Sequence, residues 1–238
     1  MRRAVPAAVV AVGLLGACAS ESAEVTGAAA GRGEVIHLPA TDGPHDVIVA
    51  FHGYGGAAGQ LEPLGLEDSG AIVLHAQGEE GAWAGAPYAV TSMEEDVAYA
   101  RALVDAVKKN HEVRDVYGVG YSNGGGFVHA LDCAVPGMFT ATVTIAPAYY
   151  AGALEPCEGN AVHAPRLNFH GDADEVIAVE GGQRHGEEYE SSREITAEIA
   201  EQGVPATTRI FSGGHDWSGA KDELAGEILE FFDLEGDS

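Results

Sequence analysis

The 238-residue sequence contains few basic residues: 12 Lys and Arg stand against 37 Asp and Glu, and the formal net charge is −25. Proteins that bind nucleic acids use Lys and Arg to neutralise phosphates, and polybasic segments attract anionic lipid headgroups. We therefore expect no nucleic-acid partner and no attachment to a membrane through a charged surface. Hydrophobic residues make up 46% of the chain and charged residues 21%, which is typical of a packed globular domain.

The sequence also lacks the motifs of several common ligand sites. It contains no HExxH zinc motif and no EF-hand loop, and it has neither the GxGxxG pattern nor the P-loop lysine of nucleotide-binding proteins. We therefore predict no catalytic metal and no cofactor. No repeat of about 20 to 50 residues is visible, and we interpret the mature chain as one domain.

The apolar run near the N-terminus, residues 4–16, is too short to cross a membrane. Its 13 residues extend about 20 Å as a helix, whereas the hydrocarbon core of a bilayer is roughly 30 Å thick. Two arginines precede the run, so we predict a signal peptide over residues 1–17. The letters LGAC at residues 15–18 resemble the bacterial lipobox, which would lipidate Cys18 and anchor an extracellular protein to the cell membrane. Ordinary cleavage and secretion is the alternative.

The next segment and the remaining cysteines fit export. Residues 18–33 are small and polar without periodicity, and we predict a lipidated flexible tether with an end-to-end distance on the order of 20 Å. Cys133 and Cys157 are left as an even pair in a chain that should leave the reducing cytosol. We predict a disulfide between them, worth roughly 3 kcal/mol in the chain-entropy account. Two separate buried thiols are the alternative.

Short apolar runs alternate with amphipathic or Gly-rich stretches from residue 34 to residue 232, which is the pattern of strands joined by crossover helices. Several runs are apolar throughout, which favours a mostly parallel central sheet covered by helices on both faces. A capping box of Ser92 and Glu95 should begin the clearest helix. The expected strands span residues 34–38, 46–51, 71–76, 115–120, 141–146, 166–170 and 207–211. The expected helices span residues 92–109, 124–133, 187–202 and 221–232.

The strongest chemical signal is a G-x-S-x-G motif at residues 120–124, with Ser122 at its centre. It stands between a strand-like and a helix-like run, where a sharp turn needs small flanking residues and lifts the serine hydroxyl above the carboxyl edge of the sheet. A serine hydroxyl is a poor nucleophile near neutral pH and needs a base, which itself needs an orienting acid. We therefore predict that Ser122 is the nucleophile of a catalytic triad.

The acid and base candidates follow later strands. Asp172 and Asp174 come just behind the strand expected at 166–170, and His215 follows two turn-forming glycines behind the strand expected at 207–211. This order of Ser, Asp and His along the chain is that of α/β-hydrolases, and we predict that His215 is the base. We expect His170 to shape the acid loop through a structural hydrogen bond. His129 falls on the helix expected after the nucleophile, where we expect it to pack or to be exposed. Six further histidines have no motif around them: His37, His45, His75, His111, His163 and His185.

Acyl transfer also needs fixed N–H donors for the oxyanion of the tetrahedral intermediate. Residues 51–56, which read FHGYGG, follow a strand and have the His-Gly-rich character of the loop that supplies one donor. We assign the first donor to the N–H of Tyr54, with Gly53 as the close alternative, and the second to Asn123, the residue after the nucleophile. A simple Gly-rich turn is the competing interpretation.

The segments FHGYGG, GYSNGGG, HGDADEVI and GGHDW, in this order, resemble the polyhydroxybutyrate depolymerase and feruloyl esterase group of α/β-hydrolases, many of whose bacterial members are exported. The resemblance covers nearly all of residues 45–232 and implies an α/β-hydrolase fold in one catalytic domain, residues 34–238. It places the acid at Asp174, while Asp172 stands where the group usually has Thr and remains the alternative. It also implies that the Trp83 region lies near the substrate cleft.

These observations predict a secreted serine esterase that hydrolyses small or oligomeric carboxylic esters, of the short-chain, hydroxyalkanoate or hydroxycinnamoyl type, through an acyl-enzyme. Aromatic residues flank the motif loops and are candidates for the substrate pocket, with core packing as the alternative for each: Tyr54, Tyr121, Tyr149, Tyr150 and Trp217. The resemblance adds Trp83 as a further pocket candidate. Two other functions remain open. One is a lipase or peptidase on the same fold, and the other is a non-catalytic surface lipoprotein that binds a ligand in the cleft.

The charge imbalance predicts that salt stabilises the protein. Loss of residues 1–17 removes two arginines and no acid, which takes the net charge from −25 to −27. Such a field keeps an extracellular domain soluble and monomeric but adds self-repulsion, which salt screens. We expect the melting temperature to rise as NaCl increases toward about 1 M, where the Debye length falls to about 3 Å. A melting temperature that does not change with NaCl would contradict this expectation.

Overall fold

A computed structural model describes residues 31–159 and 163–234 of the chain. The predicted signal peptide, the lipidation site at Cys18 and the tether up to residue 30 lie outside the described residues. Within the described ranges, no helix combines the length and the apolar character needed to cross a bilayer.

A seven-stranded sheet forms the centre of the molecule, with the strand order β1-β3-β2-β4-β5-β6-β9. All neighbouring strands run parallel except β1, which pairs antiparallel with β3 at the sheet edge. Strands β2, β3, β5 and β6 are buried along their whole length, as their continuous apolar runs predicted. The strands are β1 Val35–His37, β2 His45–Phe51, β3 Ile72–Ala76, β4 Val113–Tyr121, β5 Ala141–Ile145, β6 Arg166–Gly171 and β9 Ala206–Phe211.

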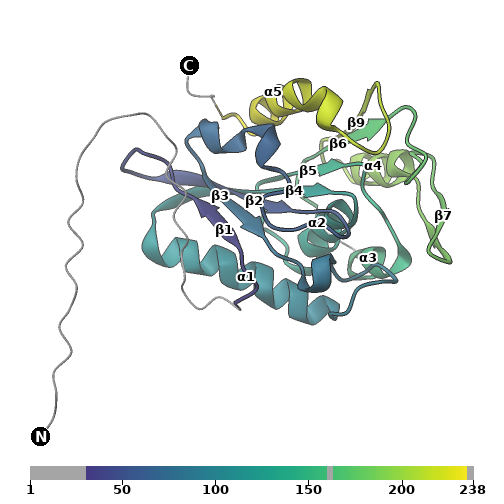
Figure 1. The fold of residues 1–238 in the computed structure, drawn as a ribbon, viewed down its shortest axis with the longest axis horizontal. Helices are drawn as coiled ribbons and strands as arrows, with labels where there is room; N and C mark the ends of the chain where they lie inside the picture. Colours follow the sequence, from purple (N-terminus) through teal and green to yellow (C-terminus); the bar gives the residue numbers. More distant parts are fainter. Residues whose placement is uncertain (1–30, 160–162, 235–238) are drawn as a thin grey trace, which may run out of the picture.

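Helices cover both faces of this sheet (Figure 1). Helices α1 and α2 pack on one face, and α5 packs on the other face together with the short 3-10 helices η1 and η2. The α-helices are α1 Met93–Asn110, α2 Asn123–Ala134, α3 Ala151–Leu154, α4 Ser192–Glu201 and α5 Lys221–Phe231. The 3-10 helices are η1 Glu62–Leu64, η2 Leu66–Ser69, η3 Glu79–Gly81, η4 Glu155–Cys157 and η5 Ser218–Ala220.

The predicted start of α1 is confirmed by its capping box. The hydroxyl of Ser92 accepts from the N–H of Glu95, and the Glu95 carboxylate accepts from the N–H of Ser92. Two N–H groups that the helix leaves unpaired are thereby satisfied.

The prediction of one helix over residues 187–202 is wrong in its first part. Residues Glu187–Tyr189 form strand β8, which pairs with β7, Gly182–Arg184, in an antiparallel hairpin. The helix begins only after Ser191, whose hydroxyl accepts from the N–H of Glu194 and caps it. The run of glutamates favours a helix by propensity, but the cap at Ser191 and the burial of Tyr189 against Tyr150 and Ile177 override it.

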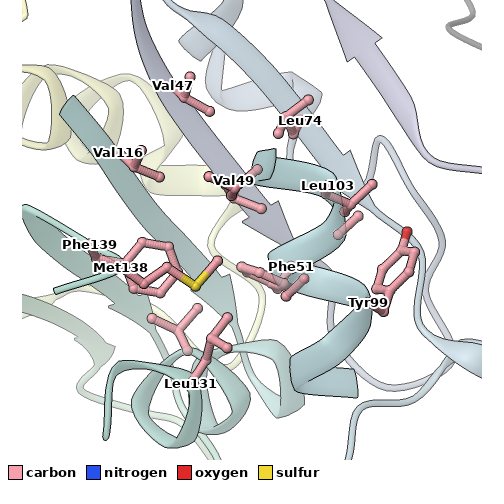
Figure 2. Packing of buried hydrophobic residues seen from close by; sticks show 14 of the residues in the cluster. Val47, Val49, Phe51, Leu74, Tyr99, Leu103, Val116, Leu131, Met138 and Phe139 are labelled. Atoms are coloured by element: carbon pink, nitrogen blue, oxygen red, sulfur yellow. The ribbon is translucent and has the colours of Figure 1, made fainter. Parts of the chain in front are cut away.

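Two layers of apolar side chains hold the sheet between its helices. Figure 2 shows the layer under α1 and α2, where Val49 and Phe51 of β2 pack with Leu103 of α1 and Leu131 of α2. On the other face, strand residues such as Val119 and Phe169 pack against α5 through Leu224 and Ile228. Truncating a fully buried residue of this kind to Ala typically costs about 2–5 kcal/mol.

Arg32, which falls within the predicted tether of residues 18–33, packs against α1. Its guanidinium bonds Asp96 of α1 at 2.6 Å and lies 4.3 Å from the centre of the Tyr99 ring. A buried carboxylate needs such a partner, so this ion pair fixes Arg32 against α1.

The predicted disulfide is confirmed. Cys133 near the end of α2 is bonded to Cys157 of η4, with the two Cα atoms 5.1 Å apart. The bond ties α2, which begins directly after Ser122, to the segment that follows β5.

A buried polar cluster lies beside this disulfide. Arg166 of β6 donates to Asp132 of α2 at 3.1 Å, and its second terminal nitrogen donates to the Nδ1 of His129. Burial lowers the pKa of His129 well below its ordinary value, and the positive charge of Arg166 lowers it further. The imidazole is therefore neutral, which leaves Nδ1 free to accept this bond.

Removal of the disulfide should destabilise the protein by about 3 kcal/mol, because the bond closes a loop with a sequence separation of 24 and restricts the unfolded chain. The test is urea unfolding of a variant that carries both Cys133→Ala and Cys157→Ala. The reductant dithiothreitol should lower the midpoint of the wild type and leave that of the variant unchanged. Equal midpoints for the oxidised wild type and the variant would refute the estimate.

Candidate active site

Ser122 stands at a sharp turn between β4 and α2, as the G-x-S-x-G motif predicted. Its backbone has φ 52° and ψ −115°, a conformation that costs a non-glycine residue strain. Hydrogen bonds on both sides hold it there. The N–H of Ser122 donates to the carbonyl of Ile145 at 2.8 Å, and its carbonyl accepts from Gly126 and Ala148 at 3.1 and 3.0 Å.

The flanking glycines of the motif are required by close backbone contacts. A Cβ atom on Gly120 would lie 2.3 Å from the carbonyl oxygen of Gly124, and one on Gly124 would lie 2.3 Å from that of Phe51. Strand β4, helix α2 and the end of β2 therefore approach each other more closely than any side chain allows.

The structure brings Ser122, His215 and Asp174 together from three loops at the carboxyl ends of β4, β9 and β6. The Ser122 hydroxyl lies 2.9 Å from the Nε2 of His215, and the Nδ1 of His215 lies 2.8 Å from the Oδ2 of Asp174. In this arrangement the serine donates to Nε2 and the Nδ1–H donates to the carboxylate. This is the geometry of a nucleophile, a base and an orienting acid.

Hydrogen bonds fix the carboxylate of Asp174. Its Oδ1 accepts from the N–H groups of Val176 and Ile177, both at 2.9 Å. Burial opposes its ionisation, but the hydrogen bonds from His170, His215 and the Ile177 N–H outweigh burial and lower its pKa. The Nε2 of His170 also bonds the Ile177 carbonyl at 2.8 Å, which is the structural hydrogen bond expected in the acid loop.

Asp172, the alternative acid, lies in a different position. Its Oδ1 accepts from the N–H of Gly213 at 3.0 Å, and its own N–H donates to Phe211. Asp172 therefore ties the acid loop to the loop that carries His215, and Asp174 alone of the two contacts the imidazole.

The loop after β2 offers one free donor near the nucleophile. The N–H of Gly53 already donates to the Oε1 of Gln60 at 2.7 Å. The N–H of Tyr54 has no acceptor within the described part of the chain. The N–H of Asn123 belongs to the first residue of α2 and so has no partner in the helix. These facts favour Tyr54 over Gly53 as the first oxyanion donor.

His52 holds this loop in place, a role that was not predicted from the sequence. Its Nδ1 bonds the Gly53 carbonyl at 2.8 Å, and its Nε2 accepts from the N–H of Gly78 at 2.9 Å. Burial lowers the pKa of His52, which keeps the ring neutral and able to accept. The His-Gly pair after a strand was the only available signal for this role.

Trp83 lies beneath the site and not in the substrate cavity, which corrects the prediction. The side chain of Asn123 accepts from the Trp83 N–H at 2.8 Å and donates to its carbonyl at 3.1 Å. The indole N–H donates to the His52 carbonyl at 2.9 Å, and the side chain is completely buried. Trp83 thus supports the loop after β2 and the start of α2.

A cavity of about 210 Å³ opens beside the Ser122 hydroxyl. Tyrosines form much of its wall, and the rings of Tyr54 and Tyr88 stack with their centres 3.8 Å apart. The residues around it are Tyr54, Gln60, Tyr88, Tyr121, Ser122, Tyr150, Val176, Ile177, Arg184, His185 and His215.

Of the aromatic residues predicted to form the pocket, Tyr54, Tyr121 and Tyr150 line this cavity. The Tyr121 hydroxyl donates to the His215 carbonyl at 3.2 Å, and burial raises the pKa of Tyr121 to about 12, so it remains a donor. Tyr149 and Trp217 are buried in the core, which corrects the prediction for both. The Tyr149 ring packs against Ile195 and Ile199 of α4. The Trp217 ring belongs to the apolar cluster that includes Leu224 and Ile228 of α5.

Two other groups have the spacing of metal ligands within the described residues, and neither contains a residue of the site above. One is His129, Cys157 and His163, in which Cys157 is already bonded to Cys133 and offers no free thiolate. The other is His37, Glu62 and His75, near the sheet edge formed by β1 and β3.

Comparison with known proteins places this geometry in context. The sequence matches no family model. It is 26% identical over 167 residues to a protein named "probable feruloyl esterase C" from Aspergillus terreus, a match that covers 64% of this chain. The chain spans 58% of the length of that relative, so the similarity is distant and partial.

Solved structures show the fold, and confirm the prediction of an α/β-hydrolase. An S-formylglutathione hydrolase from Staphylococcus aureus superposes with a TM-score of 0.63 at 12% identity, covering 89% of this chain and 98% of that one. An esterase from Pyrococcus furiosus gives 0.63 at 15% identity, covering 84% and 86%. A protein of unknown function from Agrobacterium tumefaciens gives 0.59 at 20% identity, covering 79% and 92%. The chain has the α/β-hydrolase fold and is distantly similar in sequence to the feruloyl esterase named above.

The two aspartates provide a matched test of the acid. Asp174→Asn removes the charge that orients and stabilises the imidazole, and should lower kcat for a p-nitrophenyl ester by about 10⁴-fold. Asp172→Asn keeps an oxygen that accepts from Gly213 and should change kcat by less than about tenfold. A larger loss in the Asp172 variant than in the Asp174 variant would reverse the assignment.

Proposed function

We propose that the protein is a secreted, lipid-anchored serine esterase that hydrolyses carboxylic esters. The observation that carries the proposal is the chain of hydrogen bonds from Ser122 through His215 to Asp174 at a strained turn beside an open cavity. The distant similarity to a feruloyl esterase supports ester chemistry. The Cys133–Cys157 disulfide supports an oxidising compartment, and hence export.

The first half of the reaction forms an acyl-enzyme. The Ser122 oxygen attacks the ester carbonyl while His215 takes the hydroxyl proton at Nε2, and Asp174 stabilises the imidazolium that forms. The N–H groups of Tyr54 and Asn123 hold the oxyanion. As the tetrahedral intermediate collapses, His215 returns the proton to the departing alkoxide, and the alcohol leaves.

The second half releases the acid. A water molecule gives its proton to His215 and attacks the acyl carbonyl, through an oxyanion held by the same two donors. The proton then passes from His215 to the Ser122 oxygen, which regenerates the enzyme.

The cavity indicates the kind of acyl or alcohol group that would fit. A volume of about 210 Å³ holds a short chain or one aromatic ring but no long fatty acyl chain. The hydroxyl of Tyr150 is buried at this wall without a partner among the described residues, and Arg184 is the one lysine or arginine that lines it. A buried, unpaired hydroxyl favours a ligand with a polar group of its own. Short esters with a hydroxyl or phenolic oxygen, of the hydroxyalkanoate or hydroxycinnamoyl type, suit these walls.

The test measures hydrolysis of p-nitrophenyl acetate and labelling by a fluorophosphonate probe. Wild type should turn over the ester and react with the probe, because the probe is attacked by an activated serine. Ser122→Ala should lose labelling and lower kcat by about 10⁴-fold or more while the circular dichroism spectrum stays the same. A wild type that neither reacts with the probe nor hydrolyses any ester would instead be a non-catalytic ligand-binding protein.

A substrate panel on the same two proteins tests the class of ester. The ratio kcat/KM should be highest for acetyl, butyryl, hydroxybutyryl and feruloyl esters and should fall steadily for longer acyl chains. A maximum at decanoyl or longer chains would indicate a lipase, and faster cleavage of peptides than of esters would indicate a peptidase. Either result would overturn the proposed specificity and leave the triad assignment standing.

A further inference from the structure

Two histidines share one face of the sheet edge, away from the triad. In the antiparallel register of β1 and β3, His37 lies opposite Val73 and His75 lies opposite Val35. Val73 and His75 are two residues apart on β3, so their side chains point to the same face of the sheet. His37 lies directly opposite Val73, so its side chain points to this face as well. The centres of the two imidazole rings are 5.4 Å apart. On this face Val73 packs with the apolar residues of η1 and η2.

The two 3-10 helices bring a carboxylate to each histidine. The Oε1 of Glu62 lies 3.3 Å from the Nε2 of His37, and the Oε1 of Glu67 lies 2.6 Å from the Nε2 of His75. One nitrogen from each histidine and one oxygen of Glu62 all lie within 4.8 Å of one another. The His75 side chain is only 2% exposed, while that of Glu62 is 47% exposed and gives access from solvent.

One polar atom of this cluster has no hydrogen-bond partner among the residues that the structure describes. The Nδ1 of His37 is buried and has no hydrogen-bond partner within the described part of the chain. A buried polar atom without a partner is explained most simply by an ion or a water that the side chains enclose. The strongly acidic chain, with a net charge of −25, favours a cation at such a place.

We propose that His37, His75 and Glu62 bind a divalent cation of the zinc class. Two imidazoles and a carboxylate form a common donor set for Zn²⁺, with bonds of about 2.0–2.2 Å and a fourth position for water. Tetrahedral bonds of this length separate ligand atoms by roughly 3.4 Å, so a group within 4.8 Å needs only small side-chain rotations to close on the ion.

Glu67 acts as a positioning residue in this site. A metal-bound histidine usually donates its other ring N–H to a carboxylate, which fixes the ring and strengthens it as a ligand. The bond between Glu67 and the Nε2 of His75 is of this kind and leaves Nδ1 of His75 for the ion.

The cation would fasten the edge strand β1 to η1. Glu62 stands two residues after Gln60. The Gln60 side chain accepts a hydrogen bond from the N–H of Gly53 and lines the cavity beside Ser122. Occupation of the site would therefore stabilise the first strand and the base of the loop after β2. The ligands come from three separate segments, at residues 37, 62 and 75, which is why no sequence motif indicates them.

The test titrates ZnCl₂ into the mature, untagged protein, which begins at Cys18, by isothermal calorimetry and follows the melting temperature. We expect one saturable ion per chain and a rise in the melting temperature. His37→Gln and Glu62→Gln should each weaken binding by about tenfold or more, and Glu67→Gln by about 10- to 100-fold. His111→Gln, which changes a histidine outside the cluster at the end of α1, is the matched control and should bind like the wild type.

Two results would overturn the site. One is the absence of saturable Zn²⁺ binding. The other is binding that stays the same in the His37 and Glu62 variants, which would place the ion elsewhere on the acidic surface. Both variants replace partly exposed side chains and should fold, which circular dichroism verifies. Substitution of the buried His75 is therefore not needed for the decision.

Discussion

The parallel register of β2, β4, β6 and β9 is the constraint on which the candidate site depends. Because these strands run the same way, the loops that follow them meet at one edge of the sheet. Three of those loops carry Ser122, Asp174 and His215, and the fourth carries Tyr54. Residues up to 93 apart in the sequence thereby come within hydrogen-bond distance.

Buried hydrogen bonds fix the positions of these loops relative to one another. His52 joins the loop after β2 to Gly78, and the Asn123 side chain joins the start of α2 to Trp83. Asp172 joins the loop that carries Asp174 to the loop that carries His215. Each of these contacts has one backbone partner, so each fixes the path of a loop rather than the position of one side chain. Catalysis by positioned donors needs this kind of rigidity.

Features that depend on a local residue pattern, or on the spacing of a few residues, were predictable from the sequence. Apolar runs located the seven strands, the Ser92–Glu95 box located α1, and the strand-turn-helix context of Ser122 located the nucleophile. What depends on the direction of a side chain in a loop was not predictable. Tyr149 and Tyr150 are neighbours, yet one faces α4 and the other lines the cavity. Contacts between distant segments determine the place of Tyr88 in the cavity wall, the β7–β8 hairpin, and the roles of His52 and Trp83. Short sequence motifs carry no information about such contacts.

The backbone of Ser122 also has a consequence for how this sequence can change over time. Its conformation suits glycine better than serine, so conformational stability alone would favour Gly at this position. A chain selected only for a stable fold would therefore tend to lose the hydroxyl here. A serine in this strained conformation is consistent with a trade-off between stability and activity.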